Sequence, residues 1–194
     1  VGVTGEVAPG VRQTVWTYNG AVMGPTLRGK LGDVFEITLV NKGTMAHSVD
    51  FHAGMVSPDV NMRDINPGES LVYRFRAEHT GIWLYHCATM PMAVHLAAGM
   101  FGAVIIDPPG LAPVTAEYLV TQSEWYLGPD GGPIDADKVA RGAPDLVMFN
   151  GYADQYVYRP LRAKVGDRIR MWVLDAGPNE PLSFHVIGNQ FDTV

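Results

Sequence analysis

The chain has 194 residues, and 14 Lys and Arg stand against 20 Asp and Glu, which gives a formal net charge of −6. This acidic balance argues against a nucleic-acid partner, and no apolar stretch approaches the roughly 20 residues needed to span a bilayer. The single cysteine, Cys87, excludes an intrachain disulfide framework and any metal site built from several cysteines. We therefore expect a soluble protein without a membrane span, in which this one thiol needs its own explanation.

Short runs of alternating apolar and polar residues, separated by Gly, Pro and Asn turns, predict an all-β protein. In residues 34–40, Phe35, Ile37 and Leu39 share one face while Glu36 and Thr38 share the other, and residues 71–76 alternate in the same way, as in half-buried antiparallel strands. A further strand is predicted over 101–106. It should end at 107–110, where two prolines cannot donate to a sheet. We place a domain boundary there, with a first β-domain over residues 1–110 and a second over 111–194.

An internal repeat supports two related domains. In each copy an Asn-Gly pair is followed by a Leu-Arg-x-Lys-x-Gly-Asp run, an apolar strand and a histidine: 18–20, 27–33, 34–40 and His47 in the first copy, and 149–151, 161–167, 169–174 and His185 in the second. The sequence therefore predicts a duplicated β-domain. The first copy continues for about sixty residues after its histidine and the second for only nine. We expect the second domain to be incomplete in this chain, because the alternative, a naturally half-sized domain, would expose sheet edges.

Four residues of the first copy have the identities and order of a mononuclear copper site, namely His47, Cys87, His95 and Met100. Two imidazoles and a thiolate with a weak axial thioether form the ligand set of blue-copper electron-transfer sites. Taken singly, each residue has an ordinary structural explanation, such as a buried small hydrophobe for Cys87 or a gap filler for Met100. The four together, with three of them on one short segment, favour a metal site.

A second cluster follows from strand geometry, because successive side chains of a strand point to opposite faces. His86 should point away from Cys87, and Asp50 and His52 should lie on the face opposite to His47. Two imidazoles beside a carboxylate call for a metal or a partner chain; the alternative is a pair of solvated surface histidines. The peptide link from His86 to Cys87 would join two metals on the order of 10 Å apart.

These motifs resemble those of the copper-containing nitrite reductases, which belong to the two-domain cupredoxin and multicopper oxidase superfamily. The resemblance rests on His47-Ser48-Val49-Asp50-Phe51-His52-Ala53, on Tyr85-His86-Cys87, on the spacing from His95 to Met100, and on 149–151 and 184–188 in the second domain. It implies tandem cupredoxin-like Greek-key β-sandwich domains, with copper as cofactor. The implied activity is the reduction of nitrite to nitric oxide, a step of denitrification.

The resemblance also implies roles for individual residues. His47, Cys87, His95 and Met100 would be the type 1 copper ligands, His52 and His86 two of three type 2 copper ligands, Asp50 and His185 the catalytic acid pair, and Ile187 an aliphatic cap over the type 2 copper. The third type 2 histidine would come from the second domain of a neighbouring subunit in a homotrimer, at a position beyond Val194. Electrons would come from a small redox protein and pass from the type 1 copper through Cys87 and His86 to the type 2 copper. A periplasmic or secreted location is implied as well.

Two other functions stay open. A laccase-like two-domain multicopper oxidase would reduce O₂ at a trinuclear cluster, using repeated His-x-His pairs and a second histidine directly after the cysteine. This chain has no His-x-His pair, and Ala88 follows Cys87. A non-enzymatic blue-copper electron carrier would need only one domain, and it would leave the duplication, His52, His86 and Asp50 unexplained.

Overall fold

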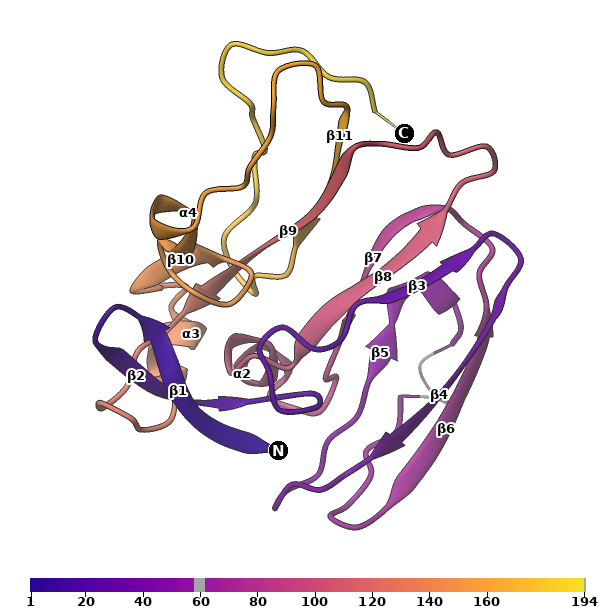
Figure 1. The fold of residues 1–194 in the computed structure, drawn as a ribbon. Coiled ribbons are helices and arrows are strands. Elements are labelled where there is room, and N and C mark those ends of the chain that lie inside the picture. Colours follow the sequence, from indigo (N-terminus) through magenta and orange to yellow (C-terminus); the bar gives the residue numbers. More distant parts are fainter. Residues whose placement is uncertain (58–61, 194) are drawn as a thin grey trace.

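The structure, a computed structural model, describes residues 1–57 and 62–193, and its elements are mostly strands, so the all-β class is confirmed (Figure 1). The strands are β1 (Gly2–Ala8), β2 (Val11–Trp16), β3 (Leu27–Lys30), β4 (Val34–Val40), β5 (Asp50–Phe51), β6 (Ser70–Arg76), β7 (Gly81–His86), β8 (Phe101–Asp107), β9 (Ala116–Trp125), β10 (Leu146–Phe149) and β11 (Ile169–Asp175). The short helices are η1 (His52–Gly54), α2 (Met92–Ala97), α3 (Ala136–Ala140) and α4 (Gln155–Tyr158). None of the helices in the described residues is long and apolar enough to cross a membrane.

The first part of the chain is a β-sandwich. One layer is a four-stranded sheet in the order β3-β8-β7-β5, and the other is the antiparallel pair β4-β6. The core between the two layers is formed by Val49, Phe51, Ala53, Tyr73, Phe75, Ala77, Tyr85, Val104 and Ile106. The strands predicted over 34–40, 71–76 and 101–106 are confirmed as β4, β6 and β8, because their apolar faces pack into this core.

The second part is a three-stranded sheet in the order β10-β9-β11, in which β11 runs parallel to β9 and β10 antiparallel. The hairpin β1-β2 packs against this part, since Val7 and Val15 share a buried cluster with Trp125 and Met148. Figure 1 shows the hairpin beside β10 and α3, across the molecule from β4 and β6. The first residues of the chain thus lie against the second sheet, and the boundary at residue 110 stays a prediction.

The repeat is visible in the backbone. In each copy an aspartate carboxylate accepts a hydrogen bond from the lysine N–H three residues earlier, at 2.8 Å in the turn 30–33 and at 2.7 Å in the turn 164–167. The glycines of these turns have nearly the same positive φ, +92° at Gly32 and +91° at Gly166. The copies differ just before the turn, where residues 27–30 form β3 but 161–164 form no strand.

Candidate metal centres

His47, Cys87 and His95 form a buried group, called here the Cys87 group. The Cys87 Sγ lies 3.8 Å from His47 Nδ1 and 3.3 Å from His95 Nδ1. Cys87 directly follows β7, His95 lies on α2, and His47 precedes β5. A strand end, a helix and a loop therefore bring together one sulfur and two nitrogens that could hold one ion.

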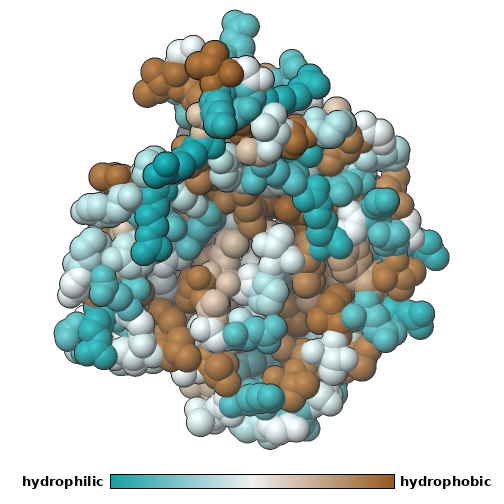
Figure 2. Space-filling view, in the orientation of Figure 1, coloured by the Kyte–Doolittle hydropathy of each residue, from teal (hydrophilic) through white to brown (hydrophobic). Residues whose placement is uncertain are grey.

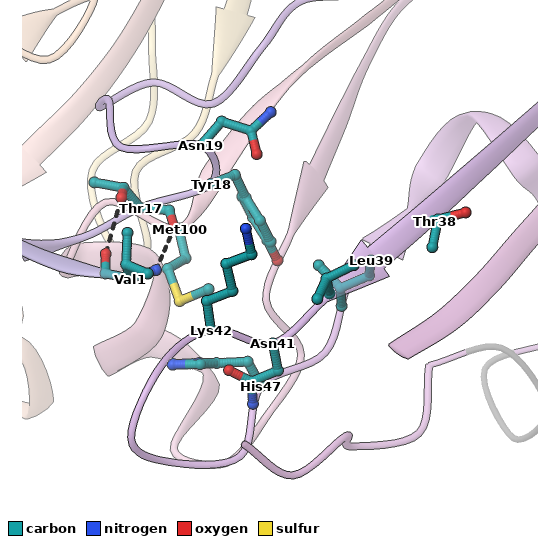
Figure 3. A pocket seen from close by; sticks show the side chains of 11 residues that line it. Val1, Thr17, Tyr18, Asn19, Thr38, Leu39, Asn41, Lys42, His47 and Met100 are labelled. Carbon is teal, nitrogen blue, oxygen red and sulfur yellow. Dashed lines mark hydrogen bonds between the residues drawn. The ribbon is translucent and has the colours of Figure 1, made fainter. Parts of the chain in front are cut away.

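Met100, the fourth residue predicted for this site, lies beside the group. Its carbonyl accepts a hydrogen bond from the Cys87 N–H at 3.0 Å, and its own N–H donates to the His95 carbonyl at 3.1 Å. The Met100 side chain is buried, and together with His47 it lines a pocket of about 320 Å³, which Lys42 also lines (Figure 3). The backbone thus holds the thioether residue against the segments that carry the other three.

The surroundings of Cys87 favour the thiolate. Burial alone raises the pKa of the thiol, but hydrogen bonds, among them those from the His47 side chain and from the backbone N–H groups of Ser48 and Thr89, outweigh this and hold the pKa below its ordinary value. Burial lowers the pKa of His95, which Asp64 partly opposes. A thiolate and a neutral imidazole are the protonation states that bind a metal ion. With two nitrogens, one sulfur and a nearby thioether, the donor set fits copper.

Trp16 is part of this site, although nothing in the sequence pattern indicates it. Its ring meets the ring of His95 edge-on at a centroid distance of 4.9 Å and that of His47 at 5.9 Å. The backbone N–H of Trp16 donates to the Ala98 carbonyl at 2.8 Å, which ties β2 to the end of α2. The Trp16 ring therefore packs against both imidazoles. An indole has no metal-ligating atom, so only these contacts show that Trp16 belongs to the site.

Asp50, His52 and His86 form a second group, called here the His52 group. The two Nε2 atoms lie 3.1 Å apart, and Asp50 Oδ2 lies 3.5 Å from that of His52 and 3.8 Å from that of His86. In the sheet, Asp50 on β5 is directly opposite His86 on β7. Strand alternation thus separates His86 from its neighbour Cys87, as predicted, although His86 is buried in this chain rather than solvated.

The protonation of the His52 group also suits a cation. The His86 Nδ1–H donates to the Cys87 carbonyl at 3.0 Å, which leaves Nε2 as the acceptor that faces Asp50 and His52. Burial lowers the pKa of His52; the Asp50 charge opposes this and His86 adds to it. Two imidazole nitrogens therefore converge beside a carboxylate oxygen, and copper is among the ions that imidazole donors hold.

His185 lies apart from both groups in the described part of the single chain. It is exposed in the segment after β11, where it lines a pocket of about 450 Å³ with apolar residues such as Phe149, Leu161 and Met171. Ile187 is also exposed. Their roles near a copper ion stay predictions, since the expected site would combine them with another subunit.

Comparison with known proteins shows the family of the chain. The multicopper oxidase family matches residues 3–110. A copper-containing nitrite reductase of Neisseria gonorrhoeae is 36% identical over 201 residues, which cover 98% of this chain and 51% of the relative. The chain thus spans about half the length of the curated relatives it matches.

Two solved structures extend the comparison. The copper nitrite reductase from Nitrosomonas europaea superposes with a TM-score of 0.85 at 35% identity, covering 93% of this chain and 66% of that one. A crystal structure described as a multicopper oxidase superposes with a TM-score of 0.78 at 29% identity, covering 93% of this chain and 61% of that one. Both likenesses support the cupredoxin-like sandwich read from the strands.

Proposed function

The chain belongs to the multicopper oxidase family, and because copper-containing nitrite reductases are 36% identical to it, we propose that the protein catalyses the copper-dependent reduction of nitrite to nitric oxide. One observation supports the proposal: of the two groups of side chains that could hold a metal ion, one contains His86 and the other contains the next residue, Cys87. An electron carrier needs only the Cys87 group. The His52 group adds a second position with a carboxylate beside it, as a reaction that consumes protons requires.

The residues that would hold copper are His47, Cys87, His95 and Met100 in one place and His52 and His86 in the other. Bound there, copper would supply one-electron storage at the Cys87 group and a Lewis-acidic position for an anion at the His52 group. The chain itself connects the two positions, since Cys87 and His86 share a peptide bond and the His86 Nδ1–H is hydrogen-bonded to the Cys87 carbonyl.

Reduction of nitrite consumes one electron and two protons for each nitric oxide and water formed. The Asp50 carboxyl is placed to deliver one proton, because its Oδ2 lies within 3.8 Å of both Nε2 atoms of the His52 group. We assign the second proton to His185 of a neighbouring subunit. Departure of one nitrite oxygen as water then leaves nitric oxide.

The assembly and supply of the enzyme belong to the same proposal. A closed homotrimer would bring a third histidine to the His52 group from a neighbouring second domain. A small redox protein would deliver electrons to the Cys87 group. The periplasm is the proposed location, where nitrite reduction would serve denitrification.

Reduction of O₂ is the second candidate, because a solved multicopper oxidase also superposes on this chain. Against it, the sequence has no His-x-His pair, and Ala88 occupies the position after Cys87. The chain therefore lacks the donors that a trinuclear copper cluster would draw from these positions.

An anaerobic assay of the copper-loaded, full-length protein tests the proposal. With a common reductant, nitrite should disappear as an equal amount of nitric oxide forms, and the same preparation should then be offered O₂. Consumption of O₂ without nitrite turnover would move the protein to the oxidases. A coloured protein that turns over neither substrate would be an electron carrier.

A further inference from the structure

A chain of hydrogen bonds lies behind the Cys87 group. Ser48 Oγ accepts from the Ala88 N–H at 3.1 Å and lies 3.1 Å from Thr89 Oγ1, which donates to Asp64 Oδ1 at 2.7 Å. An ionised carboxylate can only accept, so the Thr89 proton points to Asp64. Thr89 Oγ1 then accepts from the Ser48 hydroxyl. The three hydrogen bonds of this network therefore all run in the same direction, with each donor on the Ala88 side and each acceptor on the Asp64 side.

This hydrogen-bond network links three segments of the protein that meet at the Cys87 group. Asp64 precedes Ile65, whose backbone exchanges two hydrogen bonds with that of His47, at 3.1 and 2.9 Å. Ser48 follows His47, and Thr89 is two residues after Cys87. Ser48 and Thr89 are buried, whereas Asp64 is exposed, so a surface charge ends a path of interior hydroxyls.

The path also reaches the ligands themselves. The Ser48 N–H points at the Cys87 Sγ at 3.5 Å, so the position of Ser48 decides how that N–H meets the sulfur. The Asp64 carboxylate is near enough to His95 to act on its imidazole electrostatically. Asp64 therefore influences two members of the Cys87 group without contributing a ligand atom.

We propose that Asp64 is a positioning residue for the Cys87 group, which holds the segment after Cys87 through the Thr89 and Ser48 hydroxyls and lowers the reduction potential of copper bound there. The proposal rests on copper binding at this group, as proposed above, and not on the identity of the substrate. A negative charge near the ion favours the more highly charged oxidation state, and outer hydrogen bonds fix the orientation of the ligands.

Replacement of Asp64 tests the charge. Asp64→Asn keeps an oxygen that can accept from Thr89 and removes the charge, so the midpoint potential should rise. The substitution should change the equilibrium constant for electron exchange with a redox buffer by about fivefold, which is the effect of one solvent-screened charge. The matched control is Glu36→Gln, since Glu36 is an exposed carboxylate on β4 that pairs with Arg74 on β6.

Replacement of Thr89 tests the hydroxyl path at constant charge. In the full-length copper protein, Thr89→Val should shift the charge-transfer band and the copper hyperfine splitting, and Thr89→Ser should restore both. A potential in Asp64→Asn equal to that of Glu36→Gln would overturn the charge effect, and identical spectra in Thr89→Val and Thr89→Ser would overturn the positioning role. A parent protein without the band would overturn the copper assignment together with this inference.

Discussion

At the scale of single residues, β-strand alternation lets neighbours belong to different sites. Tyr85 points into the core between the two layers, His86 points to Asp50 and His52, and Cys87 turns back to the interior. Tyr85 is surrounded by hydrophobic side chains, whereas His86 and Cys87 each lie beside other side chains that could bind a metal ion. The separation of the two groups therefore follows from backbone geometry that the sequence alone already predicts.

Removal of the thiol should abolish the colour of the copper protein. Cys87→Ala leaves two imidazoles and a thioether without the covalent sulfur donor, so the strong charge-transfer absorption of copper(II) thiolate should disappear. Visible absorption with parallel copper analysis measures this. If the variant kept both the colour and the electron-transfer copper, the Cys87 group would not be the blue-copper site.

Replacement of the Asp50 carboxyl, the proposed proton donor of the His52 group, should slow nitrite turnover and leave copper bound at both groups. Asp50→Asn keeps size and hydrogen bonding but cannot release a proton, so nitrite turnover should fall by roughly 10²–10⁴. Copper content and the charge-transfer spectrum should stay unchanged. Replacement of His185 should give a similar loss, and the double variant should lose less than the product of the two if they share one proton path. Near-normal turnover in Asp50→Asn would exclude Asp50 from the reaction.

At the scale of elements, the sequence predicted the long strands and missed short or partner-dependent features. Alternation over six or seven residues identifies β4 and β6, and the segment ended by two prolines identifies β8. By contrast, β5 has only two residues and α2 has no side-chain cap, so the local pattern is weak in both. The ligand candidates could be named because their side chains carry the chemistry. Trp16 and Asp64 could not, because their roles depend only on contacts between segments far apart in the sequence.

A charged cluster joins the two sheets. Glu117 on β9 pairs with Arg28 on β3 at 2.6 Å and with Arg170 on β11 at 3.2 Å, and it accepts from the Trp172 indole N–H at 2.6 Å. Arg28 also pairs with Asp107 at the end of β8 at 2.8 Å. The cluster thus fixes the sandwich against the second sheet at one corner.

Loss of this carboxylate should weaken the contact in a pH-dependent way. The hydrogen bond from Arg28 is the main reason that the pKa of Glu117 falls from its ordinary 4.5 to about 2. Because the folded state favours the ionised carboxylate, Glu117 stabilises the fold above pH 4.5. This stabilisation disappears as the pH falls towards 2 and the carboxylate becomes protonated. Glu117→Gln should therefore cost about 1 kcal/mol of unfolding free energy at neutral pH, since the group is partly exposed.

Denaturant unfolding at several pH values measures this difference. The gap between the parent and Glu117→Gln should be constant at neutral pH and should narrow between pH 4.5 and 2. A gap that is the same at every pH would show that the ion pairs of Glu117 do not account for its contribution.

At the scale of the whole molecule, α4 and the segment after β11 carry exposed apolar side chains. Val157, Tyr158, Ile187 and Phe191 are more than half exposed, all in the part of the chain after β10. On the face shown in Figure 2, hydrophilic and hydrophobic residues are interspersed. Exposed apolar side chains of this size are typical of contact surfaces, and we expect other protein segments to cover them in the assembled protein.

The His52 group should likewise depend on assembly. It supplies two imidazole nitrogens and a carboxylate, and the His52 side chain is 43% exposed, which leaves the group open to a further ligand from a neighbouring subunit. We therefore expect a closed oligomer, most simply a trimer, with two coppers in each subunit. Mild dissociation should release the copper of the His52 group and leave the coloured copper of the buried Cys87 group in place. Light scattering with copper analysis across the dissociation measures both, and a monomer that retained both coppers would contradict a site shared between subunits.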